Sequence, residues 1–179
     1  MDRRNFIGLS ATALAAAGLQ PIAVTAARAA PSALAGARFD HVSLNVRDFD
    51  AALAWYRDRL GFSVEVAWRV AALGGKRLAY LTVGSVRFEL VEADPDGVGL
   101  PPAQSFPDHF ARTGFGHLCL VVEDVDAALA GLERDGVAPF VAAATYPLDG
   151  TPFERRVGFI QDPEGNVVEF AGALRRRGG

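Results

Sequence analysis

The sequence predicts an α+β fold built from two tandem copies of one β-α-β-β-β module. The first reason is an internal repeat: FDHVSLNVRDFDAALA at residues 39–54 recurs as FGHLCLVVEDVDAALA at residues 115–130, with ten of sixteen positions identical. The second reason is periodicity, because in each copy an alternating run, a helix-like run and three further strand-like runs follow one another. A repeat of this length sets the architecture in which every motif must be interpreted.

The first copy begins with a strand at residues 40–46, and a helix follows at residues 47–62. Asp48 is a suitable N-cap for this helix, and Gly61 is a suitable residue to end it. The three strands expected next are SVEVAWRV, KRLAYLTV and VRFELVEA, at residues 63–70, 76–83 and 86–93.

The second copy repeats this order, and its last two strands are joined by the turn sequence DPEGN at residues 162–166. Its expected elements are a strand at 116–122, a helix at 124–136, and strands at 137–143, 155–161 and 167–172. Between the copies, DPDGVGLPPAQSFPDHFART is rich in Pro and Gly and predicts an exposed linker. We therefore expect His109, which lies in this linker, to be a surface residue.

The first residues have the pattern of an export signal. Arg3 and Arg4, with Phe6 two positions later, match a twin-arginine pattern before a weakly apolar, Ala-rich stretch. This stretch is too short and too weakly apolar for a stable membrane anchor. The triplet Ala27–Ala29 offers a cleavage site, so we expect a periplasmic or secreted mature protein that folds, and can load a cofactor, before export.

The expected organisation is a signal peptide at 1–29, one domain at 38–172 and a basic tail at 173–179, with module one at 38–94, the linker at 95–114 and module two at 115–172. Half of the 179 residues are apolar, which is enough for one well-buried domain. Cleavage removes three arginines and one aspartate, so the formal charge changes from −3 to −5 and a nucleic-acid partner is disfavoured. Since Cys119 is the only cysteine, the chain forms no internal disulfide.

Polar residues occupy one face of the first strand of each module. His41, Ser43 and Asn45 alternate with three apolar residues, and His117 and Cys119 do the same in the second copy. An unpaired buried polar group costs about 1–3 kcal/mol, so we expect these faces to line a space that holds water or a bound group. For Cys119 itself, a small buried hydrophobe is the expected role.

The last strand of each module carries a glutamate in an otherwise apolar run, Glu89 in the first copy and Glu169 in the second. Glu92 is a nearby carboxylate, but strand alternation puts it on the opposite face. Carboxylates in such runs are usually paired or bound to a metal. Two histidines and two glutamates at matched places suit a divalent ion such as Zn, Ni, Co, Mn or Fe(II).

The segments FDHVSLNV, FELVEA, GFGHLCLVVEDVDAALAGL and FIQDPEGNVVEF together resemble the vicinal oxygen chelate superfamily, over residues 38 to about 172. This superfamily includes glyoxalase I, methylmalonyl-CoA epimerase, extradiol dioxygenases, and fosfomycin and bleomycin resistance proteins. The resemblance implies that the paired modules form an open, half-barrel-like mixed sheet around one metal ion. It also implies the ligands His41, Glu89, His117 and Glu169, with Glu169 as the catalytic base and Glu89 as a ligand that assists it.

This ligand set is that of glyoxalase I-like enzymes, which bind a small substrate through adjacent oxygens and promote proton abstraction with Zn, Ni, Co or Mn, as isomerases or lyases. Asn45 and Ala93 stand where glyoxalase I has an arginine and an asparagine that grip glutathione, so use of a thiol cofactor stays open. One alternative is an Fe(II) extradiol-type dioxygenase using His41, His117 and Glu169. Another is a non-catalytic, resistance-type binding protein. The modules can pair within one chain or across a homodimer, because the family contains both arrangements.

Overall fold

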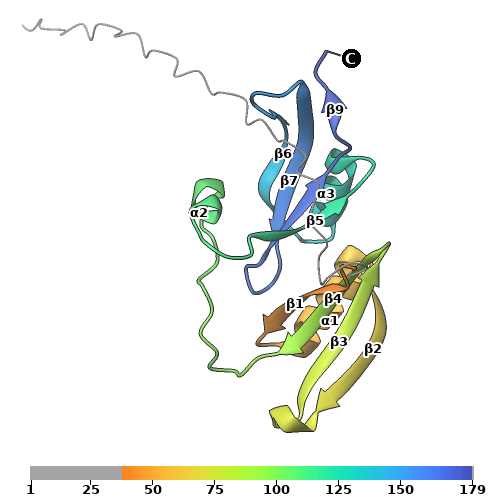
Figure 1. The fold of residues 1–179 in the computed structure, drawn as a ribbon, viewed down its shortest axis with the longest axis vertical. Helices are drawn as coiled ribbons and strands as arrows, with labels where there is room; N and C mark the ends of the chain where they lie inside the picture. The colour runs from red at the N-terminus through yellow and green to blue at the C-terminus, as the bar shows by residue number, and fades with distance from the viewer. Residues whose placement is uncertain (1–37, 179) are drawn as a thin grey trace, which may run out of the picture.

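The computed structural model describes residues 38–178, so the predicted signal peptide lies outside the described residues. The first module contains β1 (His41–Val46), α1 (Phe49–Leu60), β2 (Ser63–Val70), the short 3-10 helix η1 (Ala71–Leu73), β3 (Lys76–Val83) and β4 (Val86–Glu92). After α2 (Phe106–Phe110), the second module contains β5 (His117–Val121), α3 (Val125–Arg134), β6 (Pro139–Pro147), β7 (Phe153–Gln161), β8 (Val167–Ala171) and β9 (Arg175–Arg176). Figure 1 shows the two modules one beside the other along the long axis of the molecule.

Each module forms its own open sheet with the same strand order, β1-β4-β3-β2 in the first and β5-β8-β7-β6 in the second. The first strand of each module pairs in parallel with the last, and the other neighbours are antiparallel. The α+β class and the two β-α-β-β-β modules predicted from the repeat are therefore confirmed.

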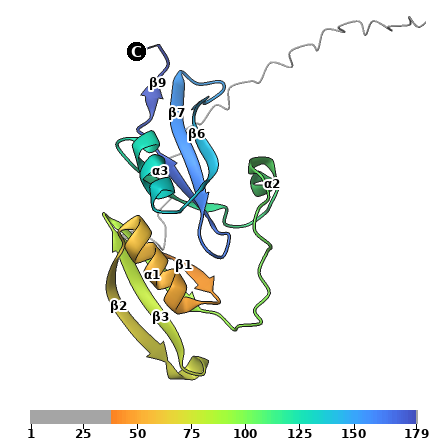
Figure 2. The ribbon, with the colours of Figure 1, turned by 180° about the vertical axis from the view of Figure 1, so that it is seen from behind.

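An aspartate caps each of the two main helices, and Asp48 is the cap that the sequence predicts. The side chain of Asp48 accepts a hydrogen bond from the Ala51 amide at 3.0 Å, and Asp124 caps α3 in the same way through the Ala127 amide at 2.9 Å. Gly61 ends α1 with a φ of 70°, a left-handed conformation in which glycine carries no steric penalty. One apolar face of each helix then covers one face of its own sheet, as Figure 2 shows for α1.

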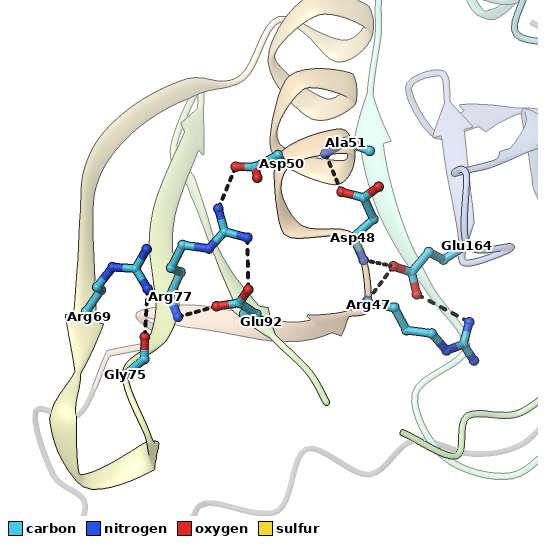
Figure 3. Close-up of polar contacts among 9 residues, drawn as sticks. All are labelled: Arg47, Asp48, Asp50, Ala51, Arg69, Gly75, Arg77, Glu92 and Glu164. Carbon is cyan, nitrogen blue, oxygen red and sulfur yellow. Dashed lines mark hydrogen bonds and ion pairs between the residues drawn. The ribbon is translucent and has the colours of Figure 1, made fainter. Parts of the chain in front are cut away.

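The two modules are joined by apolar and polar contacts at α1. Trp55 and Leu60 of α1 pack against the apolar clusters of both modules. The Tyr56 hydroxyl donates a buried hydrogen bond of 3.0 Å to Asp162 in the β7–β8 turn. From the same turn, Glu164 accepts from two backbone amides just before α1, as Figure 3 shows. A carboxylate at the start of α1 also interacts favourably with the helix dipole. The β7–β8 turn therefore contacts module one at two places, the start of α1 and Tyr56 within it.

Three details differ from the sequence expectation. The linker contains α2, which begins at Ser105, whose hydroxyl accepts from the Asp108 amide at 3.2 Å. The loop expected at residues 144–154 is shorter, because β6 and β7 extend into it. The tail contributes β9, which pairs with β7. Within residues 38–178, no helix is long and apolar enough to cross a membrane.

Candidate metal and catalytic site

The first candidate pair lies on the open face of module one, away from α1. The parallel register of β1 and β4 places Ser43 beside Glu89, and His41 Nε2 lies 3.6 Å from Glu89 Oε2. The other ring nitrogen of His41, Nδ1, lies 2.7 Å from Asp40 Oδ2. The His41 hydrogen bond, together with nearby Arg87, lowers the pKa of the Asp40 carboxyl. Asp40 therefore fixes the imidazole with Nε2 directed toward Glu89, as partners of metal-binding histidines do.

Aromatic side chains support this pair from the neighbouring strands. The Tyr80 ring lies 5.2 Å from the His41 ring, and Trp68 lies 4.8 Å from Tyr80. The Arg87 guanidinium stacks over Tyr80 and forms ion pairs with Glu65 and Asp40. The open face of module one thus combines an apolar floor with a small number of charged groups, which is typical of a small-molecule site.

The second candidate pair occupies the equivalent place in module two. Cys119 lies beside Glu169 in the register of β5 and β8, and His117 Nε2 lies 2.8 Å from Glu169 Oε2. The Glu169 side chain is 14% exposed, so it is shielded but still accessible from the open face. Burial raises the pKa of the Cys119 thiol to about 11, and the Glu169 carboxylate adds to the shift. Cys119 is therefore protonated at neutral pH, packed in an apolar cluster, and a poor nucleophile.

His109 is not a surface residue, and the sequence expectation for it is wrong. It is only 6% exposed, and its Nε2 lies 3.1 Å from His117 Nδ1. The physical reason is α2, because Phe106 packs on Phe159 at 5.1 Å and brings the helix onto the open face of module two. Burial, and then the neighbouring His117, lowers the pKa of His109. The signal that sequence reasoning overlooked is Ser105, a helix cap followed by closely spaced aromatic residues.

Glu92 lies on the opposite face of β4 from Glu89, as strand alternation predicts, and is fully engaged there. The Arg77 backbone amide and guanidinium each donate to its carboxylate at 2.9 Å, and Arg77 also pairs with Asp50, as Figure 3 shows. The hydrogen bonds from Arg77 lower the pKa of Glu92 to about 2. Glu92 is thus a structural ion-pair partner and not a metal ligand.

The structure brings the four candidate residues together as two pairs. Among residues 38–178, no group of three or more His, Cys, Asp or Glu side chains is close enough to hold one ion. The donor types fit a divalent cation, because each pair offers one imidazole nitrogen and one carboxylate. Each pair therefore offers two of the four ligands expected from the sequence, and the assignment of the four ligands stays a prediction.

A cleft of about 740 Å³ between the modules adjoins these pairs. Ser43 and Asn45 line it from the open face of module one, Phe115 and Val167 line it from module two, and His109 lines it from the linker. None of the four candidate ligands is among its lining residues. We place the candidate chemistry at the two pairs and not in the cleft, because only the pairs offer matched ligands.

Comparison with known proteins agrees with this architecture. An ethylmalonyl-CoA/methylmalonyl-CoA epimerase from Cereibacter sphaeroides is 34% identical over 99 residues, 55% of this chain and 71% of that protein. The mitochondrial methylmalonyl-CoA epimerase of Homo sapiens is 26% identical over 115 residues, which span 64% of this chain but only 63% of the human protein. A solved glyoxalase family protein from Enterococcus faecalis is 25% identical, with a TM-score of 0.54 and coverage of 75% of this chain and 96% of that one. A family model matches residues 38–170, and the chain therefore belongs to the Glyoxalase/Bleomycin resistance protein/Dioxygenase superfamily.

Proposed function

We propose that the protein is an exported, metal-dependent enzyme that removes a proton from the carbon next to a carbonyl of a small substrate, leading to isomerisation or lyase chemistry. The observation that carries this proposal is the recurrence of one His–Glu pair in both modules: His41 with Glu89, and His117 with Glu169. Duplication of the module accounts for the matching positions of the two pairs, and a shared cation would give both pairs one common task.

The chemistry assigns separate tasks to these residues. A bound divalent cation would polarise the substrate carbonyl and stabilise the negative charge that develops on its oxygen. Glu169 is the proposed base, because its carboxylate is shielded yet reachable from the open face. Glu89 is the second carboxylate and assists from module one, where His41 holds its orientation.

The named relatives support proton abstraction over oxygenation. Two of them are named as epimerases of methylmalonyl-CoA, and epimerisation in general requires a base that removes one proton from a carbon and a donor that returns it. A pair of carboxylates at equivalent places in a duplicated unit suits this reaction. We therefore propose an acyl thioester or another substrate with two neighbouring oxygens.

The experiment uses the exported, cleaved protein with and without added cobalt or zinc. Deuterium incorporation from heavy water is measured for methylmalonyl-CoA and for the glutathione hemithioacetal of methylglyoxal. Glu169→Gln is expected to reduce exchange by roughly 10²–10⁴-fold. Glu133→Gln is the matched control, since Glu133 lies exposed at the end of α3. Unchanged exchange in Glu169→Gln would remove Glu169 as the base.

Metal content is measured on the same preparations. His117→Ala is expected to abolish stoichiometric binding, and full occupancy in this variant would contradict the ligand assignment. Nickel, cobalt, zinc or manganese in anaerobically purified protein would support proton-transfer chemistry, whereas iron with oxygen uptake would support the dioxygenase alternative. Export is tested by changing Arg3 and Arg4 to lysine, which is expected to hold the precursor in the cytoplasm; normal export would point to a general secretory signal.

A further inference from the structure

We propose that His109 is a positioning residue for His117: from the linker helix α2, it fixes the orientation of the His117 ring and gives the Nδ1 atom of that ring a hydrogen-bond partner. This inference rests on the proposed function, because it gives His117 the task of a metal ligand. It adds a residue from the linker to a site otherwise built from the two repeated modules.

The contacts form a continuous chain of three side chains. His109 Nε2 lies 3.1 Å from His117 Nδ1, and His117 Nε2 lies 2.8 Å from Glu169 Oε2. Both nitrogens of His117 therefore have partners, and the plane of its ring is determined by one contact on each side. Without His109, the ring would be held by Glu169 alone and could rotate about that single contact.

The position of His109 is itself well supported. Its helix is capped by Ser105, and Asp108 accepts from the Gln104 amide at 2.9 Å and pairs with Arg112. The Phe106 ring anchors the same helix to Phe159 in β7. His109 is only 6% exposed, and a neutral imidazole there offers one donor and one acceptor nitrogen.

A neutral imidazole can serve His117 both with and without a cation. When His117 Nε2 carries a hydrogen, it donates to Glu169, and Nδ1 accepts from His109. When Nε2 binds a cation, the hydrogen must lie on Nδ1, which then donates to His109. An imidazole at position 109 matches both states by a change of tautomer, whereas an apolar residue matches neither.

The repeat provides an internal comparison. In module one, the residue directly before the histidine is Asp40, and its carboxylate holds His41 Nδ1 at 2.7 Å. In module two the corresponding residue is Gly116, which has no side chain to do so. A Cβ at Gly116 would lie 3.7 Å from His109 Nε2, so His109 occupies the space beside this glycine. The second module has thus replaced a local carboxylate with a histidine from the linker.

This replacement suggests a rescue experiment. His109→Leu keeps a side chain of similar bulk but removes the hydrogen bond. The double change His109→Ala with Gly116→Asp supplies module two with the carboxylate that module one has. Gly116 is not at a positive φ, so the backbone accepts aspartate there. Gly116→Asp alone, with His109 retained, is the control for the added charge.

Two measurements are made on the exported protein. Cobalt affinity by competition titration is expected to fall roughly 10–100-fold in His109→Leu and to recover to within about threefold of wild type in the double variant. Nitrogen NMR of His117 in the metal-free protein is expected to show an Nδ1 signal shifted by the hydrogen bond from His109 in wild type, and an unshifted Nδ1 signal in His109→Leu. Thermal unfolding of each variant is recorded to separate loss of fold from loss of positioning.

The outcomes separate this inference from the proposed function. If wild type binds neither cobalt nor zinc, the proposed function fails, and NMR still decides whether His109 positions His117. If wild type binds cobalt and folded His109→Leu binds it equally well, the inference is overturned. If His109→Leu does not fold, wild-type NMR decides: a His117 Nδ1 signal shifted by a hydrogen bond supports the inference, and an unshifted Nδ1 signal overturns it.

Discussion

The contact between the modules can be tested by changing one buried hydroxyl. Tyr56→Phe removes the only polar atom of a side chain that is 1% exposed, and that atom lies 3.0 Å from Asp162 Oδ2, in a residue that is 5% exposed. The aromatic contacts of Tyr56 with Phe62 and Phe88 do not involve the hydroxyl. The substitution therefore isolates one hydrogen bond between α1 and the β7–β8 turn.

The size of the effect follows from what remains around Asp162. A hydrogen bond to a charged group contributes about 1.5–3 kcal/mol to stability. Asp162 Oδ2 keeps a second donor, because the Asn166 side-chain amide lies 2.9 Å away, and Oδ1 keeps two backbone amides. We therefore expect a loss at the lower end of this range, about 1.5–2 kcal/mol. Burial raises the pKa of Tyr56, so the hydroxyl stays protonated throughout the measurable pH range.

Urea unfolding followed by tryptophan fluorescence measures this loss, and a fall in Tm of roughly 3–8 °C is expected alongside it. Tyr146→Phe is the matched control, because Tyr146 is 39% exposed and its hydroxyl makes no hydrogen bond within residues 38–178. Equal midpoints for Tyr56→Phe and wild type, with unchanged slopes, would refute the reasoning that this bond holds the modules together.

Two further predictions concern the ion pairs and the assembly. Since the folded pKa of Glu92 is about 2 and its ordinary value is 4.5, its contribution to stability is complete above about pH 4.5 and is lost as the pH falls toward 2. Between these pH values, the free energy of unfolding of Glu92→Gln is thus expected to change less with pH than that of Glu133→Gln. Equal slopes of the unfolding free energy against pH in the two variants would contradict the pairing of Glu92 with Arg77. The assembly is tested by mixing two variants. One lacks the first pair (His41→Ala, Glu89→Ala), and the other lacks the second pair (His117→Ala, Glu169→Ala). If a homodimer completes each site, the mixture is expected to regain about a quarter of the wild-type cobalt content. No recovery would mean that both pairs of one chain form the site.

The strands and the two main helices could be predicted because local pattern determines them. The alternation in SVEVAWRV and KRLAYLTV matches the observed limits of β2 and β3, and Asp48 and Gly61 bound α1 as expected. The limits of β6 and β7 could not be predicted, because turn-forming residues within the expected loop concealed how far the hairpin extends. Pairing partners across a hairpin, and not local composition, determine where such strands end.

The candidate site shows the same division between local and long-range information. The repeat selects His41, Glu89, His117 and Glu169, and strand alternation places each histidine on the same face as its glutamate; the structure finds the two members of each pair in contact. The buried position of His109 depends on how the linker folds back onto a sheet, and the Ser105 cap with the aromatic residues after it signals a helix there but not where that helix packs. A helix of five residues has little intrinsic stability. The packing of its Phe106 ring against Phe159 therefore stabilises α2.

The divergence of the two modules bears directly on the chemistry. In module one the histidine is held by Asp40, a carboxylate that is 60% exposed and therefore weakened by solvent and salt. In module two the histidine is held by a buried imidazole, in surroundings where hydrogen bonds are stronger and rearrange less readily. The better-fixed pair is thus the one that contains Glu169. A base must meet its proton at a defined distance, whereas a second carboxylate that assists can tolerate movement. The asymmetry of these partners therefore supports Glu169, and not Glu89, as the catalytic base.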